Sequence, residues 1–438
     1  MIHQFLNKDS KTNWGYIIGY FILFLIAPPF IAIPTIIVYM VTKSHATKSD
    51  YYLCFFAIAG YFAAINATKR MGGDQWQYYV AYMNVPDVGF WKSLVYIYGI
   101  DYFKDSSRMQ VSGEFMNGIY NYLGYYLTFG YYPLYAALLT FMDYLLVFLG
   151  LRRFCLSMKK PHIPIIAGIF TLSFFYLFFQ YTLQIQKQFL AQCIMMYVLG
   201  NYAYYGKMRK KDWIMAVCAV FTHAATLLFV PFFIFKPLHR RLTKKGLFFI
   251  GAAFAILIII APRLASGIAT DTSSALTYGV SRLATSETLN DTEFGLVWAQ
   301  VFIIALPMAL IAFRKLWLER KTLSDSSAFI LNITLLLLLT IVAMYRQPLA
   351  QYRYFMMLFA FMPFIYPFAF DNIRNRDMLL KVIAVVMILW FYYQFELIVW
   401  DYASLVDIII KSPIFLLFGN YLRGEKRSVS ICGRPENG

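Results

Sequence analysis

The residues best suited to chemistry are polar side chains at the edges of long apolar segments. Lys187 and Gln188 lie where one apolar segment begins, Gln184 lies one helical turn earlier, and His223 lies within the next apolar segment. Hydrocarbon offers such groups no hydrogen bonds, so in membrane proteins they usually face a polar cavity, a partner or a substrate. An imidazole can accept a proton near neutral pH, and an ammonium group can neutralise a phosphate. The simpler alternatives are hydrogen bonds between helices and ordinary packing.

Two acidic residues stand in one long loop, residues 68–130. Asp74 follows two glycines and precedes Tyr78, and Glu114 opens an aromatic segment. Carboxylates accept hydrogen bonds from sugar hydroxyls, and aromatic rings cover apolar C–H faces. A pair of acids also suits acid–base work at a glycosidic centre. The simpler alternatives are an acid in an interfacial aromatic belt for Asp74 and a favourable helix dipole for Glu114.

Two arginines bridge a pair of apolar segments late in the chain. Arg346 and Arg353 fall on the predicted outer face. Basic residues of membrane proteins concentrate in cytoplasmic segments, so two arginines on the outer face are unexpected. The guanidinium group offers a fixed fork for phosphate oxygens. The alternative is that both side chains reach lipid headgroups.

The composition predicts the fold class. Hydrophobic residues make up 60% of the chain and charged residues 14%. Apolar runs recur at the length of about 20 residues that a membrane-spanning helix needs, which predicts an all-α polytopic bundle of about 11 to 13 spans in a single integral membrane domain, residues 1–438. The alternating pattern of a β-barrel is not seen. The five cysteines are scattered, without the spacing of a metal site or a disulfide framework.

The basic residues predict the orientation. The net charge of +17 comes from clusters between apolar segments, where membrane topology places them, so nucleic-acid binding is not expected. The segments predicted to be cytoplasmic are 151–162, 206–212, 236–246, 314–326, 371–381 and the tail 421–438. The segments predicted to be outside are a long loop at 68–130 with an interfacial helix at 114–128, a turn at 180–187, a second long loop at 264–293, and 346–352.

Two apolar segments each admit two topologies. Residues 16–41 contain Pro28 and Pro29, so they form either one kinked span or a hairpin. Residues 213–235 have basic residues on both flanks, so they either cross once or enter and leave on the same side as two half-helices. In the second case His223 lies near the tip, roughly 16 Å into the membrane. Residues 403–418 are predicted to form the last span.

The order of these motifs resembles the EpsG-like family of exopolysaccharide polymerases, within the wider Wzy-type group, over residues 50–370. The motifs that carry the resemblance are Gly72-x-Asp74 with Tyr78, Glu114-Phe115, Lys187-Gln188 with Ala191, His223, and Arg353-Tyr354. The family pattern usually has arginine where this chain has Lys187. Lysine supplies a point charge there, without the bidentate geometry of arginine.

The resemblance implies an integral-membrane glycosyltransferase that joins polyprenyl-diphosphate-linked oligosaccharide repeats into exopolysaccharide, capsule or O-antigen. The reaction is expected on the outer side of the bacterial cytoplasmic membrane, with no metal, cofactor or nucleotide sugar. The expected partners are the lipid-linked glycan, the bilayer, a chain-length regulator and a flippase.

The expected mechanism is direct displacement at the anomeric carbon. Arg346, Arg353 and Lys187 would neutralise the leaving diphosphate. The candidate bases are His223, then Asp74, then Glu114, and the further candidate substrate-binding residues are Gln188, Tyr78 and Gln184. The alternatives are a flippase for lipid-linked oligosaccharide, a transferase that adds one sugar from a polyprenyl-phosphate donor, and a structural scaffold for the glycan machinery.

Overall fold

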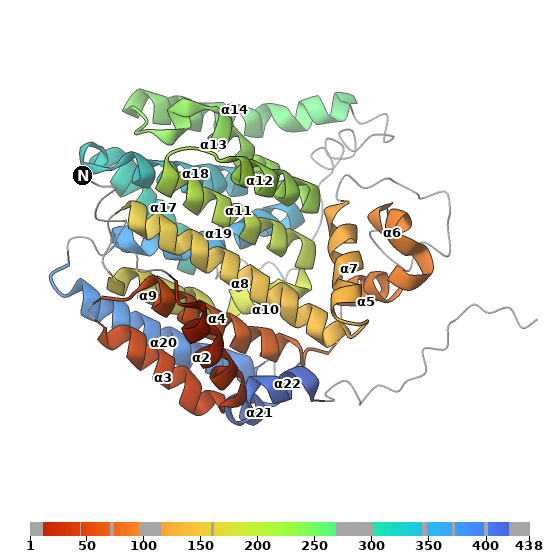
Figure 1. Cartoon of the computed structure of the whole chain (residues 1–438). Coiled ribbons are helices and arrows are strands. Elements are labelled where there is room, and N and C mark those ends of the chain that lie inside the picture. Colours follow the sequence, from red (N-terminus) through yellow and green to blue (C-terminus); the bar gives the residue numbers. More distant parts are fainter. Residues whose placement is uncertain are drawn as a thin grey trace, which may run out of the picture.

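Helices are the only regular secondary structure in the described residues. The computed structural model describes residues 12–43, 45–70, 74–95, 115–158, 162–268, 301–343, 348–369, 373–397 and 402–419. These residues contain α-helices and short 3₁₀- or π-helices but no strand, which confirms the predicted all-α class. Most of the helices lie side by side in one bundle, with α5, α6 and α7 grouped at one end of it (Figure 1).

The helices of the first half are α2 (Trp14–Ile26), α3 (Pro29–Thr42), α4 (Lys48–Asn66), α5 (Asp74–Met83), α6 (Val85–Val95), α7 (Met116–Leu127), α8 (Tyr132–Ser157), α9 (His162–Ser173), α10 (Tyr176–Gln184) and α11 (Gln186–Tyr205). Those of the second half, where η marks 3₁₀- and π-helices, are α12 (Lys210–Thr222), η3 (Ala224–Phe229), α13 (Val230–Ile234), η4 (Lys236–His239), α14 (Lys244–Ile268), η5 (Val301–Ala305), α17 (Leu306–Phe313), η6 (Arg314–Leu318), η7 (Arg320–Thr322), α18 (Asp325–Ala343), α19 (Pro348–Ala369), α20 (Arg376–Glu396), α21 (Leu405–Ile410) and α22 (Pro413–Phe418).

Three of these helices are long and apolar enough to cross a membrane, counting only the residues that the structure describes: α8, α18 and α20. The pair α9 and α10 forms a further candidate, bent by 55° at the break between the two helices. Several shorter apolar helices, α2 and α3 among them, accompany these. The chain is therefore an α-helical membrane protein, while its total of about 11 to 13 spans stays a prediction.

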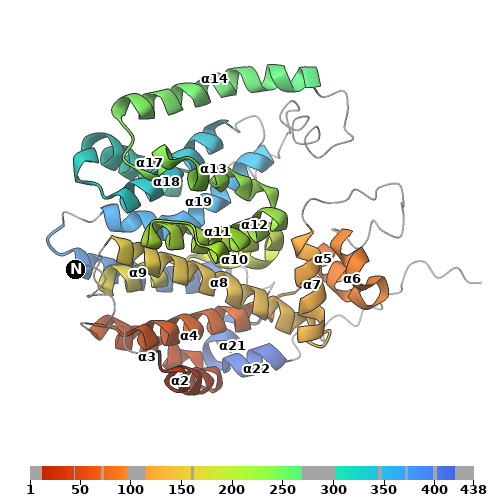
Figure 2. The same ribbon diagram turned by 45° about the horizontal axis from the view of Figure 1, so that its top comes forward.

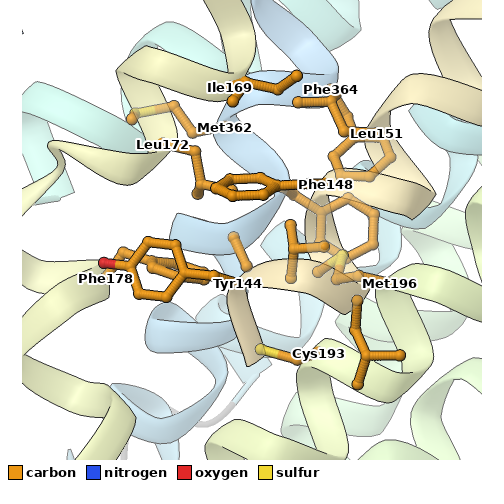
Figure 3. Packing of buried hydrophobic residues seen from close by; sticks show 14 of the residues in the cluster. Tyr144, Phe148, Leu151, Ile169, Leu172, Phe178, Cys193, Met196, Met362 and Phe364 are labelled. Carbon is orange, nitrogen blue, oxygen red and sulfur yellow. The ribbon is translucent and has the colours of Figure 1, made fainter. Parts of the chain in front are cut away.

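The centre of the bundle is the contact between α8 and α11. Glycines allow the two backbones to approach closely. A Cβ atom at Gly150 would lie 2.6 Å from the Met196 carbonyl oxygen, and one at Gly200 would overlap the Gly150 carbonyl group. Around this contact buried side chains from five helices interlock, Phe178 of α10 among them (Figure 3). They include Tyr144, Phe148 and Leu151 of α8, Ile169 and Leu172 of α9, Cys193 and Met196 of α11, and Met362 and Phe364 of α19.

The close approach of α8 and α11 makes a prediction. Replacing Gly200 with alanine forces a methyl group onto the Gly150 carbonyl, so we expect a loss of roughly 1 to 3 kcal/mol in the free energy of unfolding. Gly251 on α14 has no atom within 4 Å of an added Cβ, so Gly251→Ala is the matched control. It should stabilise the helix by about 0.5 to 1 kcal/mol. Denaturant unfolding of both variants in detergent measures the two changes in the free energy of unfolding. Equal changes for Gly200→Ala and Gly251→Ala would show that the close approach of α8 and α11 does not require glycine at position 200.

The segment with adjacent prolines is a hairpin. Pro29 is the first residue of α3, and Pro28 precedes it with extended backbone angles. The Tyr16 hydroxyl at the start of α2 lies 3.0 Å from the Tyr39 hydroxyl near the end of α3. A single kinked helix would hold these two residues some 30 Å apart at 1.5 Å per residue. The chain therefore doubles back at Pro28, which decides between the two predicted topologies.

Three predicted boundaries are wrong. Residues 403–418 form two six-residue helices, α21 and α22, separated at Lys411 and Ser412, where one span was predicted. Residues 264–268, predicted as loop, belong to α14. The described part of the region 68–130, which was predicted to be an outer loop with one helix, contains three helices, α5, α6 and α7. Residues 269–300 and the tail 420–438 lie outside the described residues.

Candidate active site

Helix α7 joins the elements that carry the candidate residues. Its residue Asn121 accepts a hydrogen bond of 2.7 Å from the Tyr135 hydroxyl of α8, which in turn accepts one of 3.3 Å from the Gln186 amide of α11. The next residue back, Tyr120, has its hydroxyl 3.2 Å from that of Thr222 at the end of α12. Adjacent residues of α7 thus contact the start of α11 and the end of α12. Figures 1 and 2 show α7 standing at this end of the bundle.

The start of α11 carries the predicted cation. Ile185 has non-helical backbone angles (φ −124°, ψ 50°) and separates α10 from α11. Lys187 and Gln188 lie in the first turn of α11, and both side chains are buried. The predicted eight-residue turn at 180–187 is therefore wrong, because α10 continues to Gln184. The side chain of Gln184 lies outside the described part. The break also means that Gln184 and Gln188 lie on different helices.

His223 lies at the tip of a re-entrant hairpin. Helix α12 ends at Thr222, His223 has extended backbone angles (φ −156°, ψ 122°), and η3 and α13 follow. The rings of Trp213 and Phe233 lie 6.2 Å apart, although the two residues are 20 positions apart in the sequence. The segment therefore returns to the side it came from. Of the two predicted topologies for residues 213–235, the structure therefore has the two half-helices. Both ends of the segment then lie on the same side, which explains why the residues flanking it are basic at both ends.

The imidazole of His223 is half-buried and contacts its own backbone. Its Nδ1 accepts a hydrogen bond of 3.3 Å from the Ala225 amide. In this arrangement a neutral ring carries its proton on Nε2. As a base, His223 would accept a proton on Nδ1 after this weak hydrogen bond is released. In the other tautomer of the ring, Nε2 would accept the proton instead.

A buried carboxylate fixes the base of the hairpin. Asp212 in the first turn of α12 accepts hydrogen bonds from Arg209 Nε at 2.7 Å and from Asn201 of α11 at 2.7 Å. Asn201 in turn accepts from Arg153 of α8. Burial alone would raise the pKa of Asp212, but the hydrogen bonds from Arg209 and Asn201 lower it below its usual value. This cluster ties three helices together at the end opposite α7.

The Asp212 cluster makes a second prediction. We expect Asp212→Asn to lower the free energy of unfolding by roughly 2 to 3 kcal/mol, because the half-buried Arg209 and the buried Asn201 lose a charged acceptor. A lowered folded-state pKa stabilises the protein above the unfolded pKa of 3.8, and this contribution disappears as pH falls through the folded value.

Unfolding measured at neutral and at acid pH checks this. The difference in the free energy of unfolding between wild type and Asp212→Asn should become smaller below pH 3.8. Asp325→Asn is the control, since Asp325 forms only an exposed pair with Arg241 at 3.9 Å, worth about 0 to 1 kcal/mol. If this difference in the free energy of unfolding stays constant with pH, the charge of the Asp212 carboxylate is not the cause of the stabilisation.

Helix α19 brings one predicted arginine close to the start of α11. The Gln192 amide donates to the carbonyl groups of Met356 and Met357, both at 3.2 Å. Arg353 lies on α19 one turn before this contact, and its side chain is outside the described part. Arg346 lies outside the described residues altogether. The backbone thus places Arg353 near the same end of the bundle as Lys187.

Helix α5 contributes the acid that was predicted in a loop. Asp74 is the first residue of α5, so the loop assignment is wrong, and its side chain lies outside the described part. Tyr78 is buried, and its neighbour Tyr79 packs edge-on against Tyr132 of α8 at 5.1 Å. Tyr82 stacks on Tyr135 at 4.7 Å and its hydroxyl lies 2.6 Å from that of Thr128. Glu114 lies outside the described residues, two residues before α7 begins at Met116.

Sequence reasoning missed Asp143. This carboxylate lies in the middle of α8 with 1% of its surface exposed, and neither oxygen has an N–H or O–H donor among the described residues. It is the lone acid in the apolar run 131–150. An acid inside a predicted span is itself a signal of function.

The described residues contain no group of three or more potential metal ligands. A family model for the EpsG family matches residues 50–406, which contain every candidate residue. Neither the curated proteins nor the solved structures contain a match to this chain.

Proposed function

The chain belongs to the EpsG family of membrane proteins of the polysaccharide-polymerase type, and from this we propose that it is a glycosyltransferase that joins polyprenyl-diphosphate-linked oligosaccharide repeats. The product would be exopolysaccharide, capsule or O-antigen. The reaction would occur on the outer side of the bacterial cytoplasmic membrane, because the basic segments assign the α7 end of the bundle to that side.

The observation that carries this proposal is the position of α7. Through Tyr120 it contacts the end of α12 next to His223, and through Asn121 and Tyr135 it connects to the first turn of α11 next to Lys187. Motifs that are distant in the sequence thus share one end of the bundle. A proton acceptor and a cation close together suit displacement of a phosphate leaving group.

In the proposed reaction a hydroxyl of the acceptor sugar attacks the anomeric carbon of the donor. A glycosidic bond forms, the bond from carbon to the diphosphate oxygen breaks, and the hydroxyl proton passes to a base. Lys187 stabilises the leaving diphosphate, and the α11 N-terminus adds to this because no side chain caps it and its dipole favours an anion. Arg353 and Arg346 are the further cations.

We propose His223 as the base, with Asp74 and Glu114 as the next candidates. The tip of the hairpin holds the ring half-buried, and Thr222 beside it is fixed by Tyr120. Gln188, Gln184 and Tyr78 would bind substrate. The proposed reaction uses no metal and no nucleotide sugar, and its expected partners are a flippase and a chain-length regulator.

The glycan profile of cells lacking the protein tests this function. Polymerisation predicts that single repeat units still reach the outer face while the long-chain ladder disappears, and that the intact gene restores the ladder. Complete repeats trapped on the inner face would instead indicate a flippase. Repeats lacking one sugar would indicate a transferase that adds a single residue. Either outcome would overturn the proposal.

A further inference from the structure

Asp143 is a buried acid that the proposed reaction does not use. It lies on α8, eleven residues from the outer end of that helix, and both carboxylate oxygens are buried without an N–H or O–H donor in the described structure. The titratable groups that interact with it are the Cys193 thiol of α11 and the Tyr144 hydroxyl of α8. The Tyr144 hydroxyl donates to the Ser173 carbonyl at 3.3 Å, so its proton is engaged elsewhere.

These surroundings favour the neutral acid. An ionised carboxylate taken out of water costs several kcal/mol unless a cation or several donors compensate. Among the described residues no lysine or arginine pairs with Asp143. A bound sodium ion would need several oxygen ligands, whereas the side chain that interacts with Asp143 from α11 is the thiol of Cys193, which belongs to the core drawn in Figure 3. A proton is the ligand that fits these groups.

Buried polar groups continue from Asp143 toward the outer end of α8. Thr140 lies one turn away on the same helix, and its hydroxyl accepts from the Asn66 amide of α4 at 2.9 Å. Asn66 also donates to Thr182 of α10 at 2.6 Å, and its Oδ1 atom has no partner in the described part of the chain. Three helices therefore contribute polar atoms at this level of an otherwise apolar core.

The same face of α8 carries two tyrosines nearer its outer end. Tyr135 accepts from Gln186, whose Oε1 has no partner among the described residues, and the buried Tyr132 hydroxyl interacts with the side chain of Gln75. Successive polar residues 132, 135, 140 and 143 are separated by about 4.5 to 7.5 Å along the helix and fall within an arc of roughly 140°. Buried polar atoms with unused hydrogen-bonding capacity are the usual sites of internal water.

We propose that Asp143 is a neutral carboxylic acid that binds an exchangeable proton at the inner end of this polar path. Internal water between Asn66, Gln186 and the tyrosine hydroxyls connects it to the α7 end of the bundle. The site is distinct from His223 and Lys187. It does not depend on the glycosyltransferase activity proposed above.

Infrared spectroscopy of the purified full-length protein in lipid nanodiscs tests the site directly. The wild type should show the carbonyl stretch of a protonated carboxylic acid at neutral pH. Asp143→Asn should lose this band, while Asp377→Asn, which removes an exposed acid paired with Arg376, should keep it. If Asp143→Asn does not fold, Asp143→Glu should shift the band. Absence of the band in folded wild type would show an ionised carboxylate and overturn the proposal.

Transfer of the same sample to D₂O tests the path and needs no variant. The acid band should shift within minutes, because internal water carries deuterons to Asp143. Thr140→Val, which removes the hydroxyl nearest on the path, should keep the band and slow its shift severalfold. A band that stays unshifted for hours would show a proton sealed in the core and would overturn the hydrated path.

Discussion

Replacing His223 with glutamine is expected to lower the rate of chain extension by roughly two to four orders of magnitude, the range that a positioned general base contributes. Glutamine keeps a polar side chain at the tip of the hairpin but cannot accept the proton of the attacking hydroxyl. The hairpin itself should persist, because Asp212 and the packing of Trp213 on Phe233 fix its base. The ladder of surface glycan, normalised to the amount of inserted protein, measures the effect.

The matched control for this variant is His45→Gln, since His45 is exposed and lies far along the chain from the hairpin. It should leave the ladder unchanged. Full extension by His223→Gln would remove His223 from the mechanism and pass the role of base to Asp74 or Glu114. A variant that fails to insert would be replaced by His223→Asn, which is smaller and equally unable to act as base.

The second large effect is expected at Lys187. Replacement by methionine keeps the length and burial of the side chain but removes the charge that stabilises the leaving diphosphate. A single group placed where charge develops is commonly worth about two to three orders of magnitude in rate. We therefore expect Lys187→Met to accumulate single lipid-linked repeats and to lose the ladder.

Lys187→Arg separates charge from packing at the same position. Arginine restores the residue usual in the family pattern and offers two donors to a phosphate. We expect this variant to retain extension, measured as the ratio of long chains to single repeats. The role of Lys187 as a cation would be contradicted if Lys187→Met were active, or if Lys187→Arg were as inactive as Lys187→Met.

The sequence was sufficient for the helical membrane class and for the two alternatives at residues 213–235. Basic residues on both flanks predict that both ends of this segment lie on the cytoplasmic side. A single crossing would place the ends on opposite sides, whereas a hairpin places them on the same side. The hairpin itself could not be predicted, since Trp213 meets Phe233 only after folding. The break at Ile185 was equally hidden, because residues 180–192 contain no glycine or proline that would signal the end of a helix.

Two further features, the break within residues 403–418 and the acid Asp143, have a signal in the sequence, but each lies inside a strongly apolar segment. Pro413 stands at the first position of α22 and Ser404 caps α21, and both are known helix-start signals inside the apolar run 403–418. Asp143 was passed over because one acid hardly changes the mean hydropathy of its segment. The contacts of α7 with both α8 and α12 lay beyond sequence reasoning, because Tyr120 and Asn121 are ordinary residues of an aromatic helix.

The most direct test of the central claim is reconstitution of the purified protein in vesicles with a single polyprenyl-diphosphate-linked repeat unit, without nucleotide sugar. Products are released from lipid and sized. Polymerisation predicts glycans of two and more repeats together with free polyprenyl diphosphate, both absent with His223→Gln. Repeats that remain single with inserted, folded protein and a verified native substrate would contradict the assignment as a polymerase.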